Sequence, residues 1–141
     1  MRWCVENRID TIIIGENRLW KQNVRLGKDN NRWFVQMPFD RLKNIIRYSG
    51  ERLGIRVVFQ EESYTSKASF LDQDDIPTYG TGERPVFSGK RIRRGMYKSR
   101  EGKKINADLN GAANILRKYK ADAFQSNMPL FEQIKVLRYP Q

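Results

Sequence analysis

The feature that most restricts the fold is an unbroken β-branched run near the N-terminus, residues 11–14 (TIII). Such a run predicts a strand buried on both faces, as in parallel sheets. A second apolar stretch at residues 55–59 predicts another strand. Between them, apolar positions recur at helical spacing from residue 39 to residue 53, with Asp40 near the start and Gly54 just after the end. A strand, a helical crossover and a second strand form a right-handed βαβ unit with a parallel sheet, so we expect an α/β fold.

The remainder of the chain is less regular. Residues 63–104 show no sustained period and contain two prolines and five glycines, which predicts an irregular insertion and not a core element. Helical spacing returns at residues 107–120. The polar, tryptophan-containing stretch before residue 38 predicts a long loop. We therefore expect a partial α/β core (1–62), an insertion (63–104), a helix (105–120) and a C-terminal tail (121–141).

Positive charge is concentrated in one segment. The chain has 27 Lys and Arg against 16 Asp and Glu, and residues 84–120 carry ten of the eleven net positive charges. Aromatic and apolar side chains interleave with these cations, which favours a phosphate-tracking surface with stacking side chains over a solvated loop. The residues expected to contact nucleic acid are Lys90, Arg91, Arg93, Arg94, Tyr97 and Lys98.

Several classes of protein are excluded. Cys4 is the only cysteine and there is no histidine, so neither a disulfide framework nor a conventional zinc site can form within one chain. A histidine general base is excluded as well. The sequence has no apolar run of about 18 residues and no signal-peptide core. We therefore expect a soluble, cytoplasmic protein that has no membrane partner.

Four segments in order carry a family resemblance: TIIIGENRLWKQ (11–22), ESYTSKAS (62–69), SGKRIRRGMYKS (88–99) and INADLNGAANIL (105–116). Together they resemble the C-terminal half of TnpB/OrfB transposases of insertion sequences, which are related to the RuvC domains of type V CRISPR effectors. The resemblance implies a partial RNase H-like (RuvC-like) fold. It also implies an RNA-guided endonuclease of a mobile element, at the prokaryotic nucleoid, with DNA and guide RNA as partners.

The resemblance further implies a metal site. The family uses acidic side chains to hold Mg²⁺ or Mn²⁺ for phosphodiester hydrolysis. Asp108 matches the aspartate of the family's third motif; outside that motif it would be an ordinary acidic residue in a first helical turn. The second acid of the site is left open among Glu16, Glu61 and Glu62. Because a strand alternates its faces, at most one of Glu61 and Glu62 points inward. Asp108 and Glu62 are the expected metal ligands.

Two departures from the family bear on activity. Where many members carry zinc-ribbon cysteines, residues 68–71 read Ala-Ser-Phe-Leu and residues 98–101 read Lys-Ser-Arg-Glu, so no zinc is expected. The family's first aspartate lies on an earlier strand that has no counterpart here. We therefore expect the C-terminal part of such a transposase, inactive as a nuclease alone. The alternative is a stand-alone nucleic-acid-binding protein without catalysis that regulates or competes with full-length transposon proteins.

Overall fold

A computed structural model of the chain describes residues 1–16, 39–80 and 85–124. The chain divides into two compact units, Met1–Glu61 and Glu62–Gln141. The long loop predicted before residue 38 and most of the predicted tail lie outside the described residues. In the part of the chain that is described, no helix is long and apolar enough to cross a membrane.

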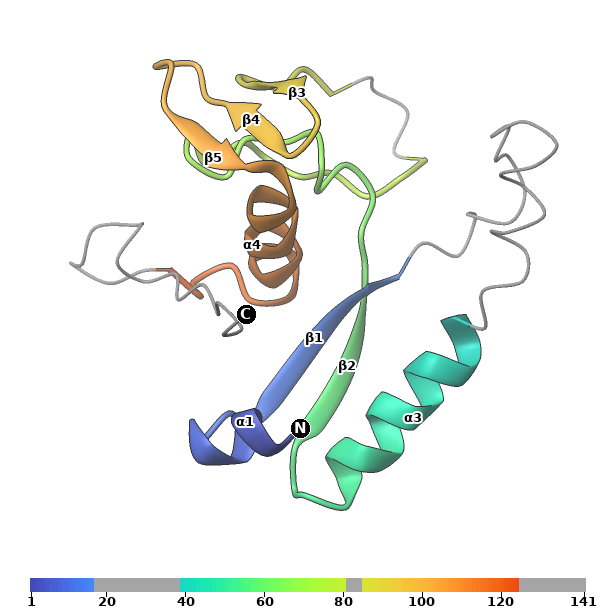
Figure 1. The fold of residues 1–141 in the computed structure, drawn as a ribbon. Helices are drawn as coiled ribbons and strands as arrows, with labels where there is room; N and C mark the ends of the chain where they lie inside the picture. Colours follow the sequence, from blue (N-terminus) through green and yellow to red (C-terminus); the bar gives the residue numbers. More distant parts are fainter. Residues whose placement is uncertain (17–38, 81–84, 125–141) are drawn as a thin grey trace, which may run out of the picture. The chain divides into compact units, whose positions relative to one another are not determined.

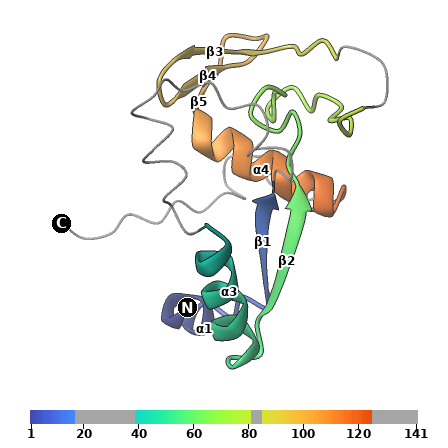
Figure 2. The ribbon, with the colours of Figure 1, turned by 90° about the vertical axis from the view of Figure 1, so that its right-hand side faces the viewer.

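The first unit is built on two parallel strands. Its elements are α1 (Arg2–Glu6), β1 (Thr11–Glu16), α3 (Phe39–Glu51) and β2 (Arg56–Glu61). The strands run side by side in the same direction, in register from Thr11 opposite Arg56 to Glu16 opposite Glu61 (Figures 1 and 2). This pair, with α3 between its strands in the sequence, confirms the expected α/β class. Among the described residues the parallel sheet has two strands, so the wider sheet of an RNase H-like fold stays a prediction.

Helix α3 approaches β2 closely at Gly50, the buried residue of this helix. A Cβ atom there would lie 2.7 Å from Cγ2 of Val57 and 2.8 Å from the carbonyl oxygen of Ile55, so a larger residue would push the helix off the strand. On the same helix, the side chains of Leu42 and Ile45 are more than half exposed. Helix α3 therefore packs on β2 with its closest described approach at Gly50, beside the paired strands β1 and β2.

The second unit is a small antiparallel sheet beside one long helix. Its elements are β3 (Lys90–Arg93), β4 (Met96–Lys98), β5 (Lys104–Asn106) and α4 (Ala107–Tyr119). The strand order is β3-β4-β5, and the sheet lies beside the N-terminal end of α4 (Figures 1 and 2). Its core consists of Phe70, Tyr97, Ile105, Ala107 and Ala113.

Residues 63–104 were expected to form an irregular insertion outside the core, and the structure differs in the second respect: the described residues up to Gly89 are irregular, but the stretch contributes to the core. Within that stretch, Ala68, Phe70 and Tyr97 are at most 1% exposed, so it supplies a large part of the core of the second unit. The strands have only three or four residues each and are rich in Lys and Arg, which gives them little intrinsic strand preference. Their conformation depends on packing against residues distant in the sequence.

Two buried asparagines join the helix to the loop that begins this unit. The Asn110 side chain accepts a hydrogen bond from the Phe70 amide (2.9 Å) and donates one to the carbonyl of Ala68 (2.8 Å). One turn later, Asn114 donates to the carbonyls of Thr65 (2.9 Å) and Ala68 (2.8 Å). Both asparagines are completely buried. Because buried backbone groups need partners, these side chains fix the path of residues 65–70 across α4.

Candidate nucleic-acid interface

A ladder of three lysines crosses the antiparallel sheet. Lys90 on β3 lies opposite Lys98 on β4, and Lys98 lies opposite Lys104 on β5. All three are exposed. Residues directly opposite one another share a face of the sheet, and neighbouring strands are about 4.8 Å apart, so three positive charges gather within about 10 Å. Like charges placed this way destabilise a sheet unless an anion lies against them.

Arginines add further positive charge on the edge strand and in the turn that follows. All four residues of β3 are exposed, including Arg91 and Arg93, and Arg94 follows in the turn to β4. We call the three lysines of the ladder and these three arginines the basic hairpin. Within the part of the chain that is described, none of the six side chains makes a hydrogen bond or ion pair with the protein. Sequence reasoning did not single out Lys104, whose place depends on the strand register.

The pairing of β3 with β4 is irregular in the middle of the basic hairpin. Arg91 lies opposite Tyr97 and Arg93 opposite Met96, so Ile92 is an extra residue without a partner on β4. An extra residue of this kind increases the local twist of a strand. The Ile92 side chain is 40% exposed, so an apolar group lies between the two arginines.

Other cations of the basic segment serve the fold. The half-buried Arg117 guanidinium donates to the Asp74 carbonyl (3.2 Å), and burial lowers its pKa despite the nearby Asp74 and Asp75 carboxylates. Lys118 donates to the carbonyls of Ser63 (3.2 Å) and Pro77 (3.3 Å). Counting positive charges along the sequence therefore overestimates the number of residues in the interface. The six residues of the basic hairpin define it better.

Tyr97, expected to stack on nucleic acid, lies in the core instead. Its side chain is 1% exposed, and its hydroxyl donates to the Lys67 carbonyl (2.7 Å). A Cβ atom on Gly89 would lie 2.5 Å from the ring, so the chain entering β3 passes directly against it. Burial, together with the nearby Asp74 and Asp72 carboxylates, raises the pKa of Tyr97 to about 12. A neutral ring enclosed in this way has no free face for a base.

Two of the four candidate acidic residues meet at one end of the parallel sheet. Glu16 and Glu61 are the last residues of β1 and β2 and lie directly opposite each other in register. The Lys43 ammonium, on α3, is 2.8 Å from a carboxylate oxygen of Glu16. The position suits a site at the carboxyl ends of parallel strands, but Lys43 already neutralises one of the two acids.

The other two acidic residues belong to the second unit. Glu62 is its first residue, and Asp108 lies exposed in the first turn of α4. The Asp108 amide donates to the side chain of Asn106, which caps the helix (2.8 Å). Over the three described ranges, no three Asp, Glu or Cys side chains come together as a group that could hold a metal ion. The candidate acids are thus divided between the two units, Glu16 and Glu61 in the first and Glu62 and Asp108 in the second.

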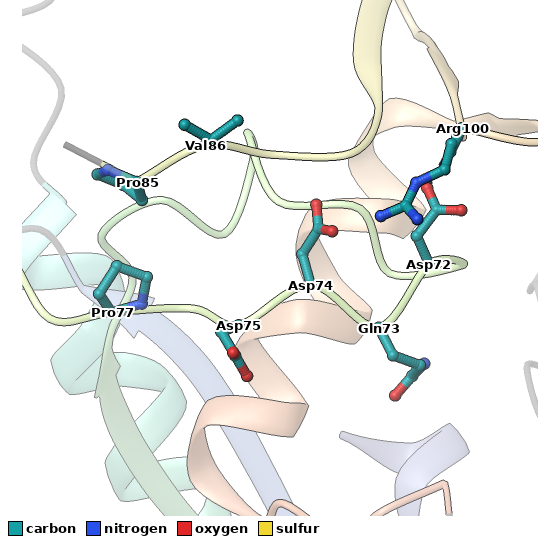
Figure 3. Close-up of a pocket in the computed structure, with 8 residues that line it drawn as sticks. All are labelled: Asp72, Gln73, Asp74, Asp75, Pro77, Pro85, Val86 and Arg100. Atoms are coloured by element: carbon teal, nitrogen blue, oxygen red, sulfur yellow. Dashed lines mark hydrogen bonds between the residues drawn. The ribbon is translucent and has the colours of Figure 1, made fainter.

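An acidic pocket of about 640 Å³ lies beside the sheet in the second unit. Figure 3 shows Pro77 and Pro85 facing each other at one end and Asp72 beside Arg100 at the other. One Asp74 oxygen accepts from the amides of Ser69 (2.8 Å) and Ser88 (2.9 Å). Burial raises the pKa of Asp74, but these hydrogen bonds and Arg100 hold it below its ordinary value. The Asp74 carboxylate thus holds together the segments that contain Ser69 and Ser88.

Asp72 connects the two segments at which a zinc ribbon was considered. Its carboxylate accepts from the Ser69 hydroxyl in residues 68–71 and from the Arg100 amide (2.9 Å) in residues 98–101. The Ser99 hydroxyl also accepts from the Lys103 amide (3.1 Å). The two segments are therefore joined by hydrogen bonds to a carboxylate. The role of Asp72 depends on a contact with a residue 28 positions later in the chain.

The model of a family described as Cas12f1-like, TNB domain, matches residues 39–115, which include α3, β2, the whole antiparallel sheet and most of α4. A comparison with curated proteins finds no match.

Proposed function

The chain belongs to the Cas12f1-like TNB domain family and so is related to TnpB and Cas12 proteins; from this premise we propose that its basic hairpin binds the phosphates of DNA or RNA. Binding is largely independent of base sequence, because phosphate contacts position a protein without reading bases. The contacts we assign are Lys90, Arg91, Arg93, Arg94, Lys98 and Lys104.

The lysine ladder is the observation that carries this proposal. Three lysines held side by side across a sheet repel one another, and the protein supplies no neutralising carboxylate within the described part. A polyanion removes the repulsion and gains entropy from released counterions. A cationic edge strand can also serve only to prevent edge-to-edge pairing of sheets. That role needs charge on β3, the edge, whereas Lys98 lies on the central strand β4.

For the family's nuclease chemistry, the proposal names metal ligands but no hydrolytic step. In a complete TnpB-like transposase, Asp108 and Glu62 would be ligands of Mg²⁺ or Mn²⁺, with Glu61 and Glu16 as alternatives. Mg²⁺ would polarise the phosphodiester and activate water there. Because the described carboxylates form no group of three, we assign no hydrolytic step to this chain. Binding without catalysis, the alternative raised by the sequence, is favoured by the Lys43–Glu16 ion pair, which occupies one acid.

The test measures binding of labelled single-stranded and duplex DNA by fluorescence anisotropy at several salt concentrations. Replacing Arg91, Arg93 and Arg94 with Ala should weaken binding of all sequences alike. It should also reduce the slope of log K against log salt by about 2 to 3, since each phosphate contact contributes about 0.7 to 0.9. The matched control replaces the exposed Arg41, Arg47 and Arg52 of the first unit, which removes the same charge.

A second variant separates binding from edge protection. Replacing Lys98 with Gln should weaken binding while raising the free energy of unfolding by about 0.2–1 kcal/mol at low salt, because the ladder loses its middle charge. The proposal is wrong if affinity does not change with salt, or if the control triple variant lowers the slope as much as the hairpin variant does.

A further inference from the structure

A partly exposed aromatic cluster lies in the second unit, formed by three rings. The Tyr64 and Tyr79 rings are stacked, with centroids 6.4 Å apart and an angle of 28° between their planes. The Phe87 ring lies 6.0 Å from Tyr64 on a tilted plane. Tyr79 is 64% exposed, although aromatic side chains gain most from burial. Neither tyrosine belongs to the buried core of this unit.

The backbone under the cluster is strained and held by hydrogen bonds. Tyr64 has a positive φ of 65°, which is rare for a bulky residue and is maintained only where the surroundings impose it. Its carbonyl accepts from the amides of Lys67 and Ala68, both at 2.9 Å, so the chain turns sharply after it. Asn114 of α4 then donates to the carbonyls of Thr65 and Ala68. The backbone that carries the Tyr64 ring is therefore tied to α4.

Positive charge lies near the cluster in space and next to it in the sequence. The Lys67 ammonium is 6.0 Å from the centre of the Tyr64 ring. Phe87 is three residues before Lys90, where the basic hairpin begins. The backbone amide of the connecting residue Ser88 donates a hydrogen bond to the Asp74 carboxylate (2.9 Å). Three residues span at most about 11 Å, the length of about three stacked nucleotides at 3.4 Å each. A strand on the hairpin can thus reach Phe87, from which the Tyr64 and Tyr79 rings follow at centroid distances of 6.0 Å and 6.4 Å.

We infer that Tyr79, supported by Tyr64 and Phe87, is a stacking platform for an unpaired base of a single strand whose phosphates lie on the basic hairpin. The inference rests on the proposed function and adds a preference for single strands. Exposed aromatic rings beside cations are the usual means of holding single-stranded nucleic acid, because every base has a π-face. Bases in a duplex are already stacked, so the platform does not contribute to duplex binding.

The experiment uses the whole chain and a single-stranded oligonucleotide containing 2-aminopurine, with the matching duplex measured in parallel. Tyr79→Ala should weaken single-strand binding about ten- to hundredfold and abolish the quenching of 2-aminopurine. The salt slope should stay unchanged, because stacking releases no counterions. Tyr79→Phe should bind as the parent does, and Tyr79→Leu as weakly as Tyr79→Ala. The matched control is Tyr48→Ala, which removes a tyrosine of similar exposure (62%) from α3.

The outcomes distinguish the platform from the hairpin. If Tyr79→Ala or Tyr79→Leu binds single strands as the parent does while the triple arginine variant is weakened, the platform is wrong and the proposed function stands. A loss of equal size on single strands and duplex also overturns the platform. If the parent chain binds neither nucleic acid, both proposals fail. Circular dichroism of each variant separates loss of binding from loss of fold.

Discussion

Replacing Asn110 with Ala should remove much of the stability of the second unit. The side chain is completely buried and bridges α4 to the loop before it, accepting from the Phe70 amide and donating to the Ala68 carbonyl. Alanine can do neither. The Ala68 carbonyl keeps its second bond, from Asn114, but the buried Phe70 amide is left without an acceptor.

The magnitude follows from these contacts. An unsatisfied buried amide costs about 1–3 kcal/mol, and the lost bond to Ala68 adds about 0.5–1.5 kcal/mol. The higher helix propensity of alanine offsets about 0.5 kcal/mol of this loss of stability. The net loss is about 1–4 kcal/mol, against a stability of roughly 4–12 kcal/mol for a unit of 80 residues, Glu62–Gln141. The variant should therefore lose a substantial part of the stability of this unit.

The assay must report on the second unit alone. Trp3, Trp20 and Trp33 all precede residue 62, so tryptophan fluorescence reports on the other unit. We would follow urea unfolding by amide NMR and measure hydrogen exchange at the Phe70 amide, which should lose its protection. Asn44→Ala, at an exposed position of α3, is the control and should change stability by no more than about 0.5 kcal/mol. Unchanged exchange at Phe70, with stability within that margin, would refute the reasoning.

Two further predictions concern charge and metal. Because the pKa of Asp74 is lowered in the folded protein, its carboxylate stabilises the fold above the unfolded pKa, and this stabilisation is lost as pH falls through the folded value. The melting temperature of Asp74→Asn should thus lie below that of the parent at pH 7 and approach it below about pH 4; an equal difference at both pH values would contradict this. The purified 141-residue chain should bind no stoichiometric zinc by elemental analysis and should not cut DNA with Mg²⁺ or Mn²⁺. Cutting that Asp108→Ala abolishes would show that its metal site is complete.

The long apolar elements could be predicted from the sequence, and the short polar ones could not. The runs at residues 11–14 and 55–59 are β-branched and apolar, so local preference and burial favour the same conformation. The spacing of apolar residues in α3 and α4 gave both helices for the same reason. In contrast, β3 reads Lys-Arg-Ile-Arg and becomes a strand only because β4 lies beside it.

The same distinction holds for the candidate site: local features of the sequence could be recognised, and contacts between distant residues could not. The cations of the basic hairpin were recognised from charge density, which is local information, whereas Lys104 joined them through strand register. Tyr97 was misassigned because an aromatic residue among cations is typical of base stacking, and its burial depends on Lys67, 30 residues earlier. The Lys43–Glu16 ion pair spans 27 residues and left no pattern in the sequence.

The asparagine contacts also set the order in which the second unit folds. The hydrogen bonds from α4 to residues 65–70 span 40 to 49 residues, whereas β3, β4, β5 and α4 follow one another directly along the chain. Closing a loop of that length costs roughly 3 kcal/mol of free energy through lost entropy, before any stabilising contact forms. We therefore expect the sheet and helix to form the folding nucleus and the earlier loop to dock after the transition state. Changes at Asn110 or Asn114 would then accelerate unfolding and leave the folding rate nearly unchanged.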